Sequence, residues 1–286
     1  MDRRPFLLTS LVGALAAPLA AQQSKSSPRL GLLGSSTAER DKGRLEAFSQ
    51  GLQELGWVDG RNITITRRLA AGRFDRLPAL AAELVRLNPD LLVVSGAPAA
   101  QAAKNATRTI RIVMTNAADP VGTGLVASLA RPGGNTTELP DFNAGVVVKR
   151  LEILREIVPS ARRVAVLLNP TNPTNPLQLK LIQEAAPALR VSLFSLEARS
   201  PEDIERAFAG MTKDPAEALI IMGDPMLGSQ LLRMSDLSVR DRLPSTYAAR
   251  EWSEGGGLVS YGPISPSSNP PSSSWSSTSR LPGRWA

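Results

Sequence analysis

The chain has 286 residues, of which 42% are apolar but only 4% are aromatic, and its formal net charge is +7 at pH 7. This length allows two domains with ordinary, mainly aliphatic cores. The sequence contains no cysteine and no histidine, which excludes disulfides, thiolate metal sites, a cysteine nucleophile and a Ser-His-Asp triad. The basic residues are scattered rather than gathered in a long run with aromatic residues, so we expect no nucleic-acid partner.

The first 21 residues have the order of an export signal. Arg3 and Arg4 precede an apolar run that begins at Phe6, and small residues lead up to Ala21. The run is too short to span a bilayer comfortably, and "RRPFL" resembles a twin-arginine signal. We therefore predict a signal peptide over residues 1–21 and a periplasmic mature protein. The alternative is an uncleaved anchor or a buried helix.

From Pro28 onward, short apolar runs alternate with helical periodicity. The stretch "RLGLLGSS" predicts a strand and a small-residue loop, and a helix follows whose face carries Leu45, Phe48, Leu52 and Leu55. The stretch "NITITRRL" predicts a second strand, and "RFDRLPALAAELVRL" a helix after its first turn. Both "PDLLVVSGAPAA" and "RIVMTNAADPVGTGLV" follow one plan of buried strand, sharp loop and new helix.

The same plan then starts again. The stretch "RPGGNTTELPDFNAG" predicts a crossing between two domains, and "RRVAVLLNPTNP" a strand with a Pro/Asn loop. Residues 175–190 and "RSPEDIERAFAGM", capped at Ser200, are predicted helices; "VSLFSL", "EALIIMGDPML", "LPSTY" and "GGLVSYG" contain predicted strands. The sequence therefore predicts an α/β protein with two doubly wound parallel-sheet lobes, over residues 28–140 and 141–260.

Small and polar residues gather where the predicted strands end. In open parallel sheets, ligands bind beyond the carboxyl ends of the strands, and the following helix aims free N–H groups at an anion. Each such loop also has an ordinary structural explanation in turn or cap chemistry, for example Ser36 as a helix cap. The candidate binding residues in these loops are Ser35, Ser36, Ser95, Gly96, Ala97, Pro98, Asp119, Asn169, Asn172 and Asp224.

Two alternatives place a different function on the same loops. Asp119 and Asp224 could form an acid–base pair across the cleft of a secreted α/β enzyme, although sugar-stacking aromatic residues are sparse. A ligand-sensing regulator would need a helix-turn-helix before residue 28, where an export signal stands instead. We expect no catalytic residues, no metal and no cofactor.

Several long stretches carry a family resemblance. The stretches are "AFSQGLQELGWVDGRNITI", "RFDRLPALAAELVRLNPDLLVVSGAPAAQAAKNAT", "ADPVGTGLVASLARPGGN", "KRLEILREIVPSARRVAVLLNPTNP" and "GGLVSYGP". Together they resemble the tryptophan/tyrosine-type substrate-binding proteins of ATP-binding-cassette (ABC) importers, from about Arg29 to Pro263.

This resemblance implies the type I periplasmic binding fold, in which two lobes joined by a hinge close on a small, amino acid-like ligand. It also implies a monomer that delivers its ligand to a membrane permease, and it adds Tyr261 to the candidate binding residues. Ala97 departs from the family's usual threonine, so a hydroxyl contact to a ligand carboxylate is lost or moves to Ser95.

The C-terminal residues 264–286 depart from this family. The stretch "ISPSSNPPSSSWSSTSRLPGRWA" has no helical periodicity and is rich in Ser and Pro, which predicts a disordered tail. Family chains continue here with an amphipathic helix that returns to the first lobe. A frameshift after about Pro263 is one hypothesis for the difference, and a genuine flexible tail is the other. In either case we expect apolar sheet surface on the first lobe to lack cover, and a non-functional remnant is a further alternative.

Overall fold

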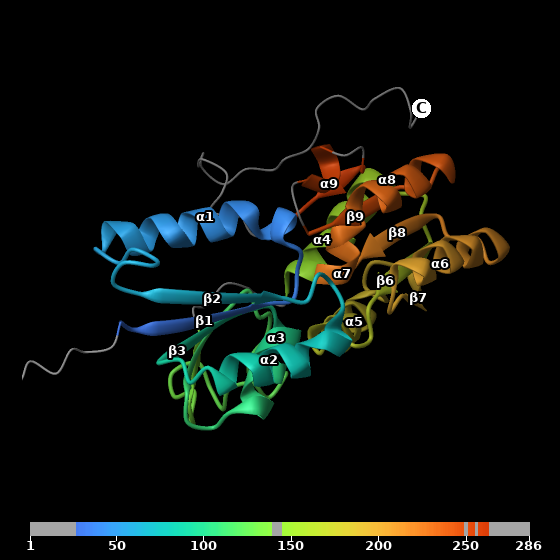
Figure 1. Ribbon diagram of the computed structural model, residues 1–286. Coiled ribbons are helices and arrows are strands. Elements are labelled where there is room, and N and C mark those ends of the chain that lie inside the picture. The colour runs from blue at the N-terminus through green and yellow to red at the C-terminus, as the bar shows by residue number, and fades with distance from the viewer. Residues whose placement is uncertain (1–26, 139–144, 249–250, 255–256, 263–286) are drawn as a thin grey trace, which may run out of the picture.

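The computed structural model describes residues 27–138, 145–248, 251–254 and 257–262 (Figure 1). The predicted signal peptide, the predicted tail and the proposed frameshift lie outside these residues. Two separate five-stranded sheets organise the chain, and every strand pairs with its neighbours in parallel. This confirms the predicted fold of two parallel-sheet α/β lobes.

The first lobe extends from β1 to β5, and its strands lie in the order β2-β1-β3-β4-β5. The register sets Leu32 of β1 beside Arg67 and Val93 of the two neighbouring strands. Its strands are β1 (Arg29–Gly34), β2 (Thr64–Leu69), β3 (Leu91–Ser95), β4 (Arg111–Thr115) and β5 (Thr136–Glu138). Its helices are α1 (Ala38–Glu54), the short 3-10 helix η1 (Phe74–Arg76), α2 (Leu77–Arg86) and α3 (Ala97–Ala106).

The second lobe repeats this topology, with strand order β10-β9-β8-β6-β7. In both lobes the first strand in sequence is internal, the second lies outside it, and the remaining three extend the sheet on the other side. The strands are β6 (Arg163–Leu168), β7 (Ser192–Glu197), β8 (Ala218–Ile221), β9 (Ser245–Tyr247) and β10 (Val259–Ser260). The helices are α4 (Val146–Ile157), α5 (Thr174–Ala185), α6 (Pro201–Lys213), α7 (Pro225–Ser229), α8 (Leu231–Arg240) and α9 (Glu251–Glu254).

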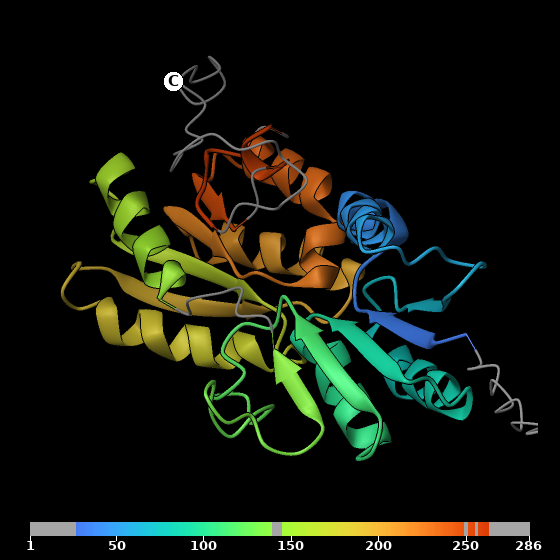
Figure 2. The same cartoon turned by 90° about the vertical axis from the view of Figure 1, so that its left-hand side faces the viewer.

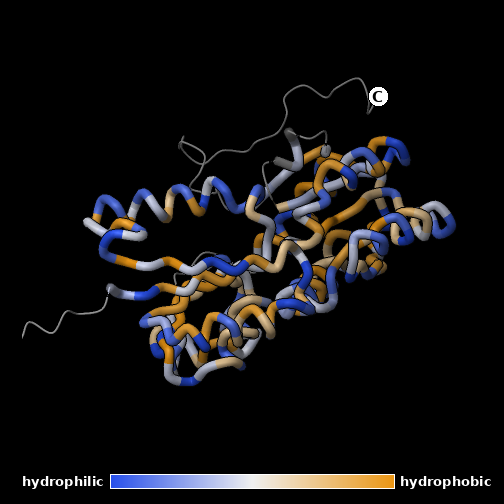
Figure 3. Tube along the Cα trace, viewed as in Figure 1, coloured by the Kyte–Doolittle hydropathy of each residue, from blue (hydrophilic) through white to orange (hydrophobic). Residues whose placement is uncertain are grey.

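The second lobe buries both faces of its sheet. Helices α4 and α5 pack on one face around Val164 and Val166, and α6, α8 and α9 pack on the other around Leu167 and Leu219. All four residues of β8 are buried. The hydrophobic segments of this lobe run along its strands, and the hydrophilic ones lie on the outer helices (Figure 3). Continuous apolar strands such as "ALII" suit a parallel sheet that is covered on both sides.

Within the described part of the chain, the first lobe buries only one face of its sheet completely. Helices α2 and α3 cover that face, and α1 lies on the opposite face (Figure 1). On the α1 side, Ile65, Leu91 and Val93 are only partly buried. We call this the half-covered face. The sequence prediction of missing cover on this lobe depends on residues 264–286, which lie outside the described residues.

Two sequence predictions about local structure were wrong, and one short strand was missed. Residues 116–135 form turns rather than a helix after β4, and Asn116 and Asp119 in these turns adopt positive φ angles of 55° and 47°, outside the right-handed helical region. The crossing stretch contains the short strand β5, which sequence alone did not reveal. Leu55 lies beyond the end of α1 and is 76% exposed, so it does not share the partly buried face of Leu45 and Phe48.

Candidate ligand-binding site

In the first lobe, the predicted residues at the ends of β1 and β3 form one cluster. The backbone N–H of Ser35 donates to the Ser95 carbonyl (3.2 Å), and the Ser35 hydroxyl accepts from the backbone N–H of Ala99 (3.2 Å). Ser35 therefore caps α3 from another strand. Gly96 has a φ of 90°, which favours glycine, and lets the chain turn sharply from β3 into α3. Ala97 and Pro98 begin that helix and are buried.

Ser36 has a different environment from its neighbour. The residue is buried, yet its hydroxyl oxygen has no hydrogen-bond partner among the described residues. The sequence left Ser36 open as a helix cap, but Thr37 takes that role and accepts from the backbone N–H of Arg40 (3.2 Å). A buried hydroxyl without a partner costs free energy, which a polar ligand group would recover. Among the described first-lobe residues, Ser36 therefore has a buried hydroxyl whose bonding capacity is unused.

Asp119 does not join this cluster in the described contacts. It is half-buried, and its carboxylate accepts from the backbone N–H of Gly122 (2.8 Å) three residues later. Its carbonyl also accepts from the hydroxyl of Thr123 (2.9 Å). These bonds close the turn that follows β4, so the structure gives Asp119 a local bonding role.

In the second lobe, the structure brings Asn169, Asn172 and Asp224 together in a buried network. The Asp224 carboxylate accepts from Asn172 Nδ2 (2.9 Å), from Asn169 Nδ2 (3.4 Å) and from the backbone N–H of Leu227 (2.9 Å), which it caps at the start of α7. The side-chain oxygens of the two asparagines accept from Thr171 and Thr174. The network fixes two loops to each other.

Burial dominates the ionisation of Asp224. The residue is 4% exposed, and desolvation raises the pKa of its carboxyl above the ordinary value, while the bonds from Leu227, Asn172 and Asn169 oppose the rise. A carboxylate already engaged by three donors is well placed to hold the loop in shape. Any ligand contact would have to share those oxygens.

Sequence reasoning missed Tyr247, although it ends the strand β9 and obeys the same carboxyl-end rule. Its hydroxyl donates to the Asp224 carbonyl (3.2 Å), and its ring lies 6.1 Å from that of Trp252. Burial raises the pKa of the Tyr247 hydroxyl. The predicted site residue Tyr261 is half-buried, and its backbone N–H donates to the Tyr247 carbonyl (3.1 Å). The two tyrosines are thus neighbours at this end of the sheet.

The two lobes meet at the short helix α7, which directly follows Asp224 (Figure 1). Arg40 of α1 donates from Nη1 to the carbonyl of Gly228 (2.9 Å). A Cβ placed on Gly96 would lie 3.9 Å from Pro225, and one placed on Gly72 would lie 3.2 Å from the Met226 backbone. Three segments of the first lobe therefore contact α7, close to both polar clusters.

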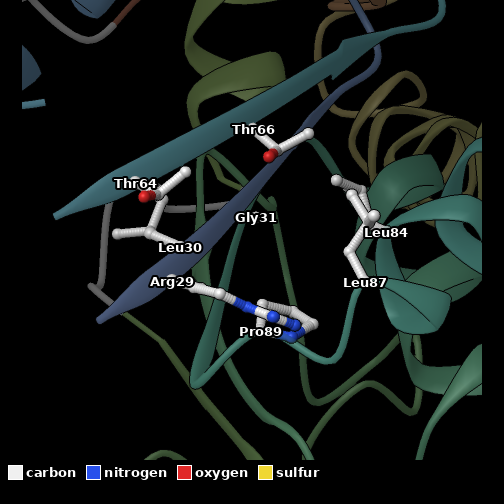
Figure 4. A pocket seen from close by; sticks show the side chains of 8 residues that line it. All are labelled: Arg29, Leu30, Gly31, Thr64, Thr66, Leu84, Leu87 and Pro89. Atoms are coloured by element: carbon white, nitrogen blue, oxygen red, sulfur yellow. The ribbon is translucent and has the colours of Figure 1, made fainter. Parts of the chain in front are cut away.

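A separate cavity of about 170 Å³ lies at the opposite end of the first sheet (Figure 4). Arg29 and Thr64 line it, and both begin their strands. It contains none of the predicted binding residues, and the apolar side chains of Leu30, Leu84, Leu87 and Pro89 also line it. Within the described part of the chain, there is no group of three or more Asp and Glu residues suited to a metal ion. None of the described helices has the length and apolar character needed to cross a membrane.

Comparison with known protein families decides the assignment. The model of a family described as ABC transporter substrate binding protein matches residues 39–265. This chain belongs to that family. Its members bind substrates outside the cytoplasm for ABC transporters, which agrees with the resemblance carried by the sequence motifs.

Individual relatives agree with this assignment. The tyrosine-binding protein of Clostridioides difficile (strain R20291) is 27% identical over 199 residues, or 70% of this chain and 57% of that protein. The chain thus spans less than two thirds of that relative's length. A conserved domain protein from Vibrio cholerae O1 biovar El Tor has a TM-score of 0.76 at 26% identity, covering 82% of this chain and 79% of its own. A Streptococcus pneumoniae domain in complex with L-Trp has a TM-score of 0.75 at 23% identity, covering 82% and 78%. These likenesses show the type I periplasmic binding protein fold.

Proposed function

We propose that this chain is the extracytoplasmic solute-binding component of an ABC importer, and that it holds a small, amino acid-like molecule between its two lobes. Family membership gives the class of protein. One observation supports a ligand position between the lobes. Both polar loop clusters lie close to α7, where the lobes contact each other. The ligand would complete its contacts there only when the lobes are together, so binding favours the closed state.

The proposed ligand class is an aromatic amino acid. One relative is a tyrosine-binding protein, and a structural neighbour was solved with L-Trp. In this chain the buried hydroxyl of Ser36 lacks a partner, and the rings of Tyr247 and Trp252 pack behind the loop that carries Asp224. A polar group of the ligand would satisfy Ser36.

The proposed setting follows from the N-terminal sequence and the family. The export signal over residues 1–21 would take the chain to the periplasm, with "RRPFL" selecting the twin-arginine route. There the protein would act as a monomer and deliver its ligand to a membrane permease. We propose no nucleic-acid partner and no cofactor.

The structure does not favour the alternative of a carboxylate enzyme. Asp224 is a buried helix cap engaged by three donors, and Asp119 closes its own turn. No described contact joins the two residues. We propose that both carboxylates hold loops in shape and that the protein binds its ligand without turnover.

Calorimetry on the purified chain tests the proposal with L-tyrosine, L-tryptophan and the other amino acids as probes. We expect saturable one-to-one binding of an aromatic amino acid, which chromatography then recovers unchanged. Ligand at 100 times its Kd should add about 2.7 kcal/mol to the free energy of unfolding. The absence of any heat or thermal shift with the aromatic amino acids would overturn the ligand class, and a chemical change in the recovered ligand would overturn the non-enzymatic role.

The position between the lobes has its own test. Arg40→Ala removes a charged donor that joins the lobes through Gly228, so we expect ligand affinity to fall about tenfold, the effect of one such hydrogen bond. Lys42→Ala is the matched control, because Lys42 is exposed on the same helix and has only a 4.0 Å contact with Glu46. Equal affinities for the two variants would argue against binding between the lobes.

A further inference from the structure

Arg150 is a buried cation with few partners. It lies on α4, and the residue is 1% exposed. Its Nη1 donates to the carbonyl of Ile221 (2.8 Å), and its Nε has no hydrogen-bond partner. Among the residues that the structure describes, no carboxylate pairs with it. A guanidinium has five N–H donors, so most of its bonding capacity is unused.

Such a group is costly for the protein that contains it. Burial lowers the pKa of Arg150 to about 10, so the side chain still carries its charge at neutral pH. Buried charges in proteins are normally paired, because removing an ion from water costs several kcal/mol that only a counter-charge and further hydrogen bonds recover. The described residues provide one carbonyl and no counter-charge. A bound anion would supply the counter-charge that the described residues do not provide.

Arg150 lies at the ligand-binding end of the second sheet. Ile221 is the last residue of β8, and Asp224 follows it three residues later. Tyr247, which ends the neighbouring strand, is close enough for its ionisation and that of Arg150 to influence each other. Helix α4 begins at Val146, beside the first lobe, and runs away from it (Figure 2), and Arg150 belongs to the first half of this 12-residue helix.

We propose that Arg150 is the anion anchor of the site, and that the ligand presents a carboxylate to its guanidinium. This inference rests on the proposed function and narrows the ligand class, since it requires a ligand that carries a carboxylate and excludes simple amines. The planar guanidinium matches a carboxylate with two parallel hydrogen bonds. The empty protein then holds an uncompensated cation, and ligand binding removes that cost.

The competing explanation is that Arg150 serves only to satisfy the Ile221 carbonyl. Arg155 on the same helix is an example of an arginine with a structural role. It is partly exposed, and its guanidinium donates to the carbonyls of Leu189, Val158, Pro159 and Ala161. Replacing such a residue leaves several carbonyls without donors. We therefore expect substitution of Arg150 and substitution of Arg155 to have opposite effects on the stability of the ligand-free protein.

The test compares Arg150→Met and Arg150→Lys with Arg155→Met, all in the full chain. In thermal unfolding without ligand, Arg150→Met should have a Tm equal to or above that of the unsubstituted protein, because a buried cation is replaced by an apolar side chain of similar length. Arg155→Met should lower the Tm. A clear fall in Tm for Arg150→Met, as large as that for Arg155→Met, would overturn the proposal whether or not any ligand binds.

Binding provides the second readout. With L-tryptophan and L-tyrosine as probes, Arg150→Met should weaken affinity on the order of 100-fold or more, and Arg150→Lys less, since it keeps the charge but not the two-pronged geometry. Tryptamine and tyramine lack the carboxylate and should bind the unsubstituted chain far more weakly. If the amino acids bind and Arg150→Met binds them equally well, the anion anchor is wrong while the binding function stands. If the unsubstituted chain binds none of these probes, the proposed ligand class fails, and the Tm comparison alone decides whether Arg150 is an uncompensated cation.

Discussion

At the scale of single residues, the candidate site separates into side chains whose polar atoms are in use and side chains with capacity to spare. Some side-chain oxygens already accept hydrogen bonds that hold loops and helix ends, namely those of Ser35, Asn172 and Asp224. Ser36 and Arg150 are buried and have polar atoms without a partner. The residues that shape the site are therefore distinct from those we expect to contact the ligand.

The two adjacent serines give a matched pair of predictions. Ser35→Ala leaves the backbone N–H of Ala99 without its acceptor, so we expect a loss of about 1 kcal/mol in the free energy of unfolding. Ser36→Ala removes a hydroxyl without a partner and should leave stability unchanged or slightly higher, while ligand affinity falls several-fold. Urea unfolding and calorimetry measure the two effects. The same loss of stability from both variants would contradict the distinction.

Asp224 gives a prediction about pH. Because burial raises its folded pKa, its contribution to stability is fully present below the unfolded pKa of about 3.9 and is lost as pH rises through the folded pKa. Asp224→Asn cannot ionise. The stability of the unsubstituted protein minus that of Asp224→Asn should therefore fall in urea unfolding as the pH rises above about 4. A flat or rising difference for Asp224 would reject the raised pKa.

Sequence reasoning found most of the polar loop residues because one rule, the carboxyl end of a parallel strand, selects them. It could not separate a side chain bonded to its own loop, such as Asp119, from one with a free hydroxyl, such as Ser36. That distinction depends on which donors lie near each acceptor in space. Arg150 lies inside a helix and not in a loop, so the same rule passed over it.

At the scale of elements, the tight turns between strands and helices bring the lobes within reach of each other. Helix α7 approaches the first lobe at Gly72 and Gly96, which both have positive φ angles. A side chain at either position would strain the backbone and push against a neighbour. The glycines therefore serve both the local turn and the contact between the lobes.

Gly96→Ala should show this cost. Its φ of 90° disfavours any residue with a Cβ, and the new atom would lie 3.1 Å from the Ser35 hydroxyl. We expect a loss of about 1–2 kcal/mol in the free energy of unfolding. Gly51→Ala is the matched control: Gly51 lies inside α1, and an added methyl group would have nothing within 4 Å, so this variant should gain about 0.5–1 kcal/mol. Thermal or urea unfolding of the two variants would contradict this account if they moved in the same direction.

The sequence predicted elements well where apolar periodicity was long and the caps were clear. Helix α6 begins at Pro201, as expected, with the Asp203 carboxylate accepting from the backbone N–H of Ser200 (2.9 Å). Strand β5 was not predicted because its three residues are too few to show a periodic pattern. Its pairing with β4 also depends on the loop before it, where Asn135 Nδ2 donates to the Ile110 carbonyl (2.6 Å). Short elements held by distant partners need the tertiary structure to be seen.

At the scale of the whole molecule, the two lobes have one topology but unequal cover. In the second lobe α4 and α5 lie together on one face of the sheet, whereas in the first lobe α1 lies on the corresponding face and the half-covered face results. Apolar burial stabilises by roughly 25 cal/mol per Å². The first sheet therefore draws less stabilisation from its surroundings than the second.

Hydrogen exchange should reveal this difference. Strands β3 and β8 are both internal to their sheets, but β3 alternates between buried and partly buried residues while β8 is buried throughout. We expect the amides of β8 to exchange more slowly than those of β3 in the protein without ligand, as measured by mass spectrometry. Equal protection, or slower exchange in β3, would show that the half-covered face does not weaken the first lobe.

The repeated topology also has a consequence for how the chain folds. Every described strand pair joins two strands of the same lobe, so the described strands of each sheet can pair without residues of the other lobe. The loops that must close are correspondingly short, and closing them costs little chain entropy. The molecule can thus assemble as two successive folding events. Docking of α7 against Arg40, Gly72 and Gly96 then joins two units that are already formed.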